Sequence, residues 1–162
     1  MESKMSDKVT VIEVKVIEQP ARHLVGMKIR TNMRNAQAVC PALWQTFGPR
    51  MGEVKASDVQ GSYGVCIMLN ADDFDYWAAV EAPEAASLPS GMESMELPGG
   101  VYAKAAVPSL EQLGEAYTYL YDTWLKGQTG YAASLGAPCF EHYPPNWQIN
   151  DAFDVYMPLV KA

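Results

Sequence analysis

PSLEQLGEAYTYLYDTWLKG, residues 108–127, is the stretch of the chain whose pattern decides the fold. Ser109 and Gln112 have the S-x-x-Q spacing of a capping box, which predicts that a helix begins here. Gly127 is the residue at which the helix should end. Apolar and aromatic side chains recur every three or four residues, so one broad face of the helix should be buried. That face carries Leu110, Leu113, Tyr117, Leu120, Tyr121, Trp124 and Leu125.

Short apolar segments on both sides of this helix predict strands at 101–107, 138–143 and 153–160. The same order of strand, helix, strand and strand is predicted earlier in the chain. The earlier elements are a strand at 24–29, a helix that carries Val39, Leu43, Trp44 and Phe47, and strands at 63–69 and 74–81; a further strand at 9–17 precedes them.

Equivalent landmarks of the two halves keep nearly one offset: Trp44 and Trp124 lie 80 positions apart, and Phe74 and Phe153 lie 79 apart. A βαββ unit used twice predicts an α+β fold, with a mainly antiparallel sheet, helices on one face and a ligand cleft between the halves. A small α+β domain without duplication is the alternative. We expect a single domain over 1–162, with repeat 1 at about 9–83, an acidic linker at 84–100 and repeat 2 at about 101–162.

Composition narrows the classes of protein that the chain can belong to. Hydrophobic residues make up 49% of its 162 residues and charged residues 19%, which favours a packed domain over disorder or coiled coil. The net charge of −7 disfavours binding to a phosphate backbone. No apolar run approaches the roughly 18 residues of a membrane span, and the first residues are polar, so we expect a cytoplasmic protein with reduced cysteines and no membrane partner.

Four motifs follow one another in the second half: Trp124-Leu125, Thr129-Gly130-Tyr131, Pro138 to Tyr143 and Val155 to Leu159. Their order and spacing resemble the GyrI-like family, the gyrase-inhibitor-like small-molecule-binding domain that also serves AraC-type and MerR-type multidrug regulators as effector-binding domain. In the first half, Leu43-Trp44 with Phe47 resembles the first helix of the family, and Phe74 to Val80 resembles its F-x-Y-x-A-G-V strand. Thr129 replaces the usual serine, and Ala79 a common glycine.

This resemblance implies a pocket between two βαββ halves, with a buried glutamate that attracts cationic, aromatic ligands. The match places that glutamate at Glu141. No helix-turn-helix segment is left once both repeats are assigned, so the resemblance implies a stand-alone version of the domain without direct DNA binding.

Glu141 also stands out in the residue pattern itself. In a strand at 139–143, alternation puts Cys139, Glu141 and Tyr143 on one face and Phe140 with His142 on the other. If the first face lines a pocket, the carboxylate is desolvated and its pKa is raised. An exposed glutamate at a sheet edge is the alternative reading.

Aromatic side chains of the strands and loops are the other candidates for the site, because flat rings stack on planar ligands and hold cations. Most of them are also reasonable core residues. Tyr117, Tyr121 and Trp124 lie at helical spacing and are interpreted as docking the helix on the sheet. The candidate ligand-binding residues are Glu141, Tyr143, Trp77, Tyr76, Tyr63, Tyr102, Tyr131, Trp147 and Tyr156.

Metal and cofactor sites are not predicted. His23 and His142 are the only histidines, and neither has a second ligand at helical spacing. The glycines form no phosphate-binding loop. Cys139 and His142 should face opposite sides of their strand, which argues against a nucleophile pair.

We expect a module that senses or sequesters small, hydrophobic, often cationic molecules. A hydrolase of reactive cyclopropane-bearing or other electrophilic compounds is the alternative, with Glu141 as catalytic base and Tyr143 or Trp77 positioning the electrophile. A gyrase-inhibitor-like protein-interaction module is a further alternative, in which the acidic segment 84–100 meets a basic partner. A homodimer is also left open.

Overall fold

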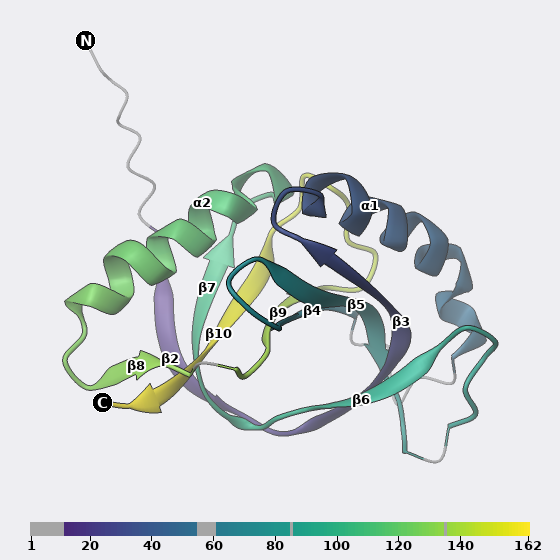
Figure 1. Cartoon of the computed structure of the whole chain (residues 1–162), viewed down its shortest axis with the longest axis horizontal. Coiled ribbons are helices and arrows are strands. Elements are labelled where there is room, and N and C mark those ends of the chain that lie inside the picture. Colours follow the sequence, from purple (N-terminus) through teal and green to yellow (C-terminus); the bar gives the residue numbers. More distant parts are fainter. Residues whose placement is uncertain (1–11, 55–60, 85, 135) are drawn as a thin grey trace, which may run out of the picture.

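Antiparallel strands and two helical segments build the fold (Figure 1). The computed structural model describes residues 12–162 except 55–60, 85 and 135, so residues 9–11 of the first predicted strand lie outside the described residues. The strands are β2 (Val14–Gln19), β3 (Arg22–Asn32), β4 (Ser62–Met68), β5 (Asp73–Glu81), β6 (Glu93–Leu97), β7 (Gly100–Val107), β8 (Tyr131–Ala133), β9 (Cys139–Tyr143) and β10 (Phe153–Lys161).

The order of the strands in the sheet mirrors itself about its centre. It runs β2-β7-β10-β9-β4-β5-β3-β6, with β8 added on β10, and every pair is antiparallel. Reading outward from the central β9–β4 pair, β10, β7 and β2 on one side correspond to β5, β3 and β6 on the other. The predicted α+β fold with a mainly antiparallel sheet is confirmed.

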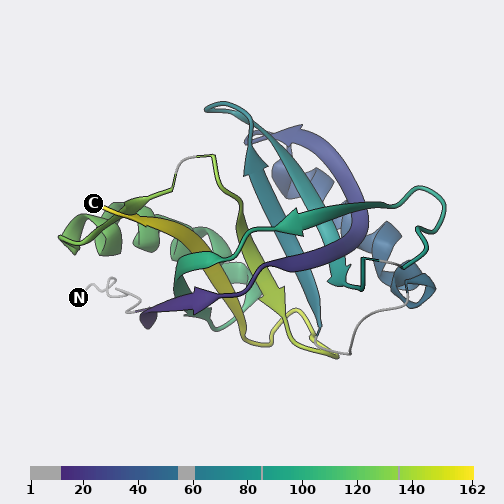
Figure 2. The same ribbon diagram turned by 90° about the horizontal axis from the view of Figure 1, so that it is seen from below.

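A long two-stranded ribbon curls the sheet. β2 continues into β3, and β6 continues into β7, after two-residue breaks that each contain a proline. The pairing keeps one register from Val14 opposite Ala105 to Gly26 opposite Glu93, so the ribbon is continuous across both breaks (Figure 2). At the break, a Cβ on Gly99 would lie 2.7 Å from the backbone nitrogen of Ala21, so the close approach of the two chains requires glycine there.

Both helical segments cover the same side of the sheet (Figure 1). α1 spans Ala36–Phe47 and runs on into a 3-10 turn at Gly48–Glu53. The second segment begins with a 3-10 turn at Leu110–Gln112, continues as α2 (Leu113–Thr118) and ends with a π-helical stretch at Tyr119–Trp124 and a last turn at Leu125–Gly127.

The side-chain to backbone hydrogen bonds expected of the predicted capping box do not form. Ser109 precedes the helix in an extended conformation, but its side chain makes no bond to a backbone amide. Its hydroxyl instead donates to Oε1 of Gln112 at 3.4 Å. The first turn is a 3-10 turn, in which the amide of Gln112 already bonds to the carbonyl of Ser109, and the reciprocal side-chain caps do not form.

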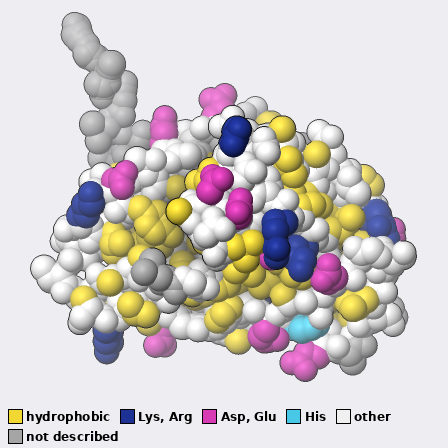
Figure 3. Space-filling model, in the orientation of Figure 1, with side chains coloured by type: hydrophobic (Ala, Val, Ile, Leu, Met, Phe, Trp, Pro, Cys, Tyr) yellow, Lys and Arg dark blue, Asp and Glu magenta, His cyan; other side chains and the backbone are white. Residues whose placement is uncertain are grey.

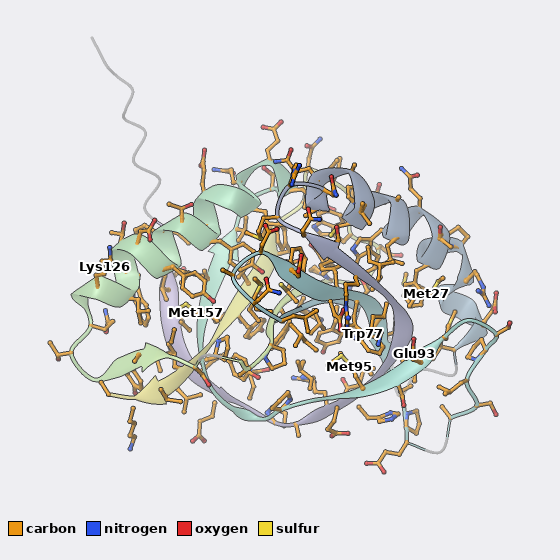
Figure 4. All side chains as sticks on the ribbon, in the orientation of Figure 1. Met27, Trp77, Glu93, Met95, Lys126 and Met157 are labelled. Atoms are coloured by element: carbon orange, nitrogen blue, oxygen red, sulfur yellow. The ribbon has the colours of Figure 1, made fainter. Side chains whose placement is uncertain are left out.

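The buried residues that the structure describes form three clusters. One lies beneath α2 and contains Met157, a second lies beneath α1, with Met27 packed against it, and a third fills the inner face of the curled sheet (Figure 4). Trp77 of β5 belongs to the inner cluster, and Met95 of β6 packs against it. On the face seen in Figure 3, charged side chains of both signs are scattered around exposed apolar side chains below α2. None of the helices in the described part of the chain is long and apolar enough to cross a membrane.

The segment predicted as a linker is partly wrong. Residues 93–97 form β6, which pairs with β3, and Leu97 is buried with 1% of its surface exposed. Its two exposed glutamates, Glu93 and Glu96, hide this short strand from a hydrophobicity pattern, yet it covers an edge of β3 that would otherwise be unpaired. β8 was not predicted either, because three residues are too few for a period to be read.

We predict that Gly26→Ala destabilises the protein by about 1–3 kcal/mol, because this is the usual cost of overpacking. The added Cβ would overlap the carbonyl oxygen of Ala78 and lie 2.6 Å from Cα of Ala79, and these backbone atoms are held in the β3–β5 ladder and cannot move away. Gly114→Ala is the control: nothing lies within 4 Å of its Cβ, and it should stabilise by about 0.5–1 kcal/mol. Urea unfolding of both variants checks the pair, and equal stabilities for Gly26→Ala and wild type would contradict it.

Candidate functional site

Glu141 is a buried carboxylate at the centre of the sheet. It lies on β9, which is held between β10 and β4, and only 4% of its surface is exposed. Because side chains alternate along a strand, Cys139 and Tyr143 share its face, while Phe140 belongs to the inner cluster on the other side. The alternative of an exposed edge glutamate is therefore wrong.

Three phenols donate hydrogen bonds to this carboxylate. The hydroxyl of Tyr143 donates to Oε1 at 2.7 Å, that of Tyr117 to Oε2 at 2.8 Å and that of Tyr76 to Oε1 at 3.4 Å. The indole nitrogen of Trp44 in turn donates to the Tyr76 oxygen at 2.9 Å. Residues of β5, β9, α1 and α2 thus converge on one acid, and we call Glu141 with these four side chains the carboxylate cluster.

Burial dominates the electrostatics of the cluster. Desolvation raises the pKa of Glu141, and the hydrogen bonds from the three phenols oppose this shift without cancelling it. Burial, with the nearby Glu141, also raises the pKa of Tyr76, Tyr117 and Tyr143, so the phenols remain protonated donors. No ion pair among the described residues includes Glu141. The carboxylate is therefore solvated by dipoles alone.

A glycine on the neighbouring strand makes room for the carboxylate. Gly64 of β4 lies directly opposite Glu141 in the β4–β9 pair. A Cβ at this position would lie 2.5 Å from the Tyr76 hydroxyl and 2.7 Å from Oε1 of Glu141. Any larger residue would push the acid or the phenol out of its place.

Three cysteine thiols lie near the carboxylate cluster. Cys66 of β4 lies opposite Cys139 of β9, and the Cys139 thiol donates to the Cys66 carbonyl at 3.9 Å. Burial, and then the nearby Glu141, raises the pKa of Cys40 on α1 to about 11. All three cysteines are free thiols, and Cys40 is neutral at physiological pH.

This architecture matches a known family. The family model described as the GyrI-like small-molecule-binding domain matches residues 12–160. The chain belongs to the GyrI-like family. Its domain is 27% identical over 157 residues to the transcriptional regulator BrlR of Pseudomonas aeruginosa, an alignment that covers 91% of the chain and 56% of the regulator, so the chain spans about half the length of this curated relative.

Solved structures agree with the GyrI-like fold. The SAV2435 protein, determined in complex with tetraphenylphosphonium, superposes with a TM-score of 0.71 at 18% identity, covering 91% of this chain and 94% of that one. The C-terminal domain of EcmrR superposes with a TM-score of 0.68 at 11% identity, covering 94% and 100% of the two chains. At these identities the likeness shows the fold.

The structure divides the aromatic side chains that were predicted for the site into separate groups. Tyr76 and Tyr143 are hydrogen-bonded to Glu141. The ring of Trp147 packs on that of Tyr143, with the ring centroids 4.8 Å apart. Tyr131 lies on β8, where it pairs with Lys161 at the C-terminal end of β10. The remaining candidates, Tyr63, Trp77, Tyr102 and Tyr156, belong to the inner cluster on the opposite face. A single pocket does not contain them all.

Three residues of the site were missed by the sequence analysis. Tyr117 was interpreted only as a helix-docking residue, and Trp44 as a landmark of the repeat, because spacing shows which face a ring lies on but not what its polar atom meets. Gly64 gave no signal, since its meaning depends on which strand lies beside β9. The ligand and catalytic roles given to Glu141, Tyr143 and the other candidate residues in the sequence analysis remain predictions, as do the hydrolase and protein-interaction alternatives.

Glu141→Gln should change how stability depends on pH. Burial raises the pKa of Glu141 in the folded state, so protonated Glu141 stabilises the fold. This contribution to the free energy of unfolding is complete below the ordinary glutamate pKa and is lost as the pH rises through the folded-state pKa. The variant lacks this loss, so its free energy of unfolding relative to wild type should increase as the pH is raised from about 4 toward neutrality. Denaturant unfolding at a series of pH values measures the difference; a difference independent of pH would contradict the raised pKa.

Proposed function

We propose that this GyrI-like domain binds lipophilic, aromatic cations and holds them against the carboxylate of Glu141. In a cell such binding would serve to sense or to sequester the cation. The observation that carries the proposal is a glutamate that is almost fully buried, accepts three phenol hydrogen bonds and has no ion-pair partner among the described residues.

An incoming cation would supply the charge that the cluster lacks. A buried carboxylate without a counter-ion is costly to ionise, and a positive charge placed beside it favours the ionised form. In a site of low effective dielectric this attraction is stronger than it would be in water. A neutral ligand of the same shape gains nothing from it, so the cluster selects for charge.

The walls of the cluster suit aromatic ligands. Trp44, Tyr143 and Trp147 form a run of edge-to-face contacts, with ring centroids 5.7 Å apart for the first pair and 4.8 Å for the second. Such rings present faces and edges to a planar ligand and attract cations at about 0.5–2 kcal/mol each. The protein that superposes at a TM-score of 0.71 was determined with tetraphenylphosphonium, an aromatic cation, which makes that compound the natural probe.

Access to Glu141 requires the helical segments to give way. Tyr117 of α2 donates directly to the carboxylate, Trp44 of α1 donates to the oxygen of Tyr76, which does the same, and Glu141 is only 4% exposed. Tyr117 lies two residues before the π-helical stretch Tyr119–Trp124. Such stretches are rare within helices and recur at functional sites. Movement of this part of the second helical segment is the simplest way to open the cluster.

Titration with tetraphenylphosphonium, followed by tryptophan fluorescence, tests the proposal. We expect wild type to bind it and Glu141→Gln to bind at least about tenfold more weakly, a loss of about 1.4 kcal/mol or more. Neutral triphenylphosphine oxide should bind both proteins with affinities within about twofold of each other, because it does not use the negative charge.

Glu96→Gln is the matched control. Glu96 is an exposed residue of β6, and its replacement changes the net charge by the same amount as Glu141→Gln. It should leave the affinity for tetraphenylphosphonium unchanged. Equal weakening by both variants would assign the effect to the overall charge of the protein, and equal affinity of Glu141→Gln and wild type would remove Glu141 from the site.

A further inference from the structure

A cavity of about 320 Å³ lies on the inner face of the curled sheet. Phe140 and His142 line it, and these are the side chains of β9 that point away from the face of Glu141. The cavity is therefore on the opposite side of the sheet from the carboxylate cluster. Its volume is at the lower end of the roughly 300–1,000 Å³ found for small-molecule sites.

Flat rings form one wall of this cavity. Phe140 and Tyr156 are stacked with centroids 4.4 Å apart and planes 9° from parallel, and Tyr63 lies with its centroid 4.9 Å from the ring of His142. Burial raises the pKa of Tyr156 to about 12, so its phenol is protonated at neutral pH. This wall suits a flat aromatic ligand.

Arg22 and Glu81 are the charged pair that lines this cavity, and only one side of the Arg22 guanidinium faces the acid. Nη1 donates to Oε1 of Glu81 at 3.1 Å, and Nη2 donates to the amide oxygen of Gln19, also at 3.1 Å. Nε is buried and has no hydrogen-bond partner in the part of the chain that the structure describes. A buried donor without a partner is costly, and an acceptor brought by a ligand would satisfy it.

Two other arginines of this protein show which group the edge of a guanidinium formed by Nε and Nη2 binds. Arg30 uses these two nitrogens to bind both carboxylate oxygens of Asp75, at 2.9 and 3.3 Å. Arg50 uses them to bind both oxygens of Glu53, each at 2.8 Å. At Arg22 the same edge meets only the neutral amide of Gln19. The geometry of a forked carboxylate contact is present there without the carboxylate.

We propose that the cavity is a second binding site, for the carboxylate of a flat aromatic acid. The acid displaces the Gln19 amide, binds Nε and Nη2 of Arg22 through both oxygens, and lays its ring on the wall of Tyr63, Phe140 and Tyr156. The net charge of −7 repels anions in general, so such binding would depend on this local contact. The two faces of β9 then serve ligands of opposite charge.

Isothermal titration of the full chain with 2-naphthoate tests this site. We expect wild type to bind 2-naphthoate and Arg22→Lys to bind it at least about tenfold more weakly, because lysine keeps the charge but loses the fork. Wild type should bind the neutral 2-naphthamide more weakly than 2-naphthoate by a similar factor. Gln19→Ala should bind 2-naphthoate as tightly as wild type or more tightly, because it clears the edge of Arg22 without removing a contact of the acid.

A variant and a competition experiment distinguish this site from the carboxylate cluster. Glu141→Gln should bind 2-naphthoate with wild-type affinity, and tetraphenylphosphonium should not compete with it. The proposal fails if wild type does not bind 2-naphthoate at millimolar concentration, or if Arg22→Lys binds as well as wild type. Competition by tetraphenylphosphonium would place 2-naphthoate in the carboxylate cluster and would also overturn it, whereas loss of tetraphenylphosphonium binding alone would leave it untouched.

Discussion

The burial of the Glu141 carboxylate is the constraint on which the rest of the structure depends. An acid at the centre of a sheet must be hydrogen-bonded on all sides, and here phenols from β5, β9 and α2 meet that need. Gly64 is required for the same reason, because it leaves the space that the acid and Tyr76 occupy. The helices are therefore positioned by a polar cluster as well as by their apolar faces.

The central position of β9 gives the molecule two chemically different faces. The face toward the helices holds an acid surrounded by phenols and thiols, and the inner face holds stacked rings beside an arginine. The curled ribbon of β2–β3 and β6–β7 makes the second face possible, because it folds the sheet around the inner cluster. A flat sheet would expose those rings to water.

Much of the fold could be predicted from the sequence, because hydrophobic periodicity and the residues that end helices and strands are local features of the chain. The predicted strands 74–81 and 153–160 and the helix at 110–127 agree with the structure to within about one residue at most ends. β6 was not predicted because its two exposed glutamates break the hydrophobic pattern. In the site, alternation correctly put Glu141 with Tyr143, but assigning Tyr63 and Tyr76 to different faces required the order of strands in the sheet. The role of Tyr117 depended on a contact between α2 and β9, which no spacing within either element encodes.

A direct measurement of the Glu141 pKa tests the central claim, that this acid is desolvated, lacks a counter-charge and receives a cation. Carbon-13 NMR of the glutamate side-chain carboxyl, assigned with Glu141→Gln, follows its titration with and without tetraphenylphosphonium. The account predicts a pKa above the ordinary glutamate value in the free protein and a lower pKa when the cation is bound. An ordinary pKa that does not change when the cation binds would contradict it.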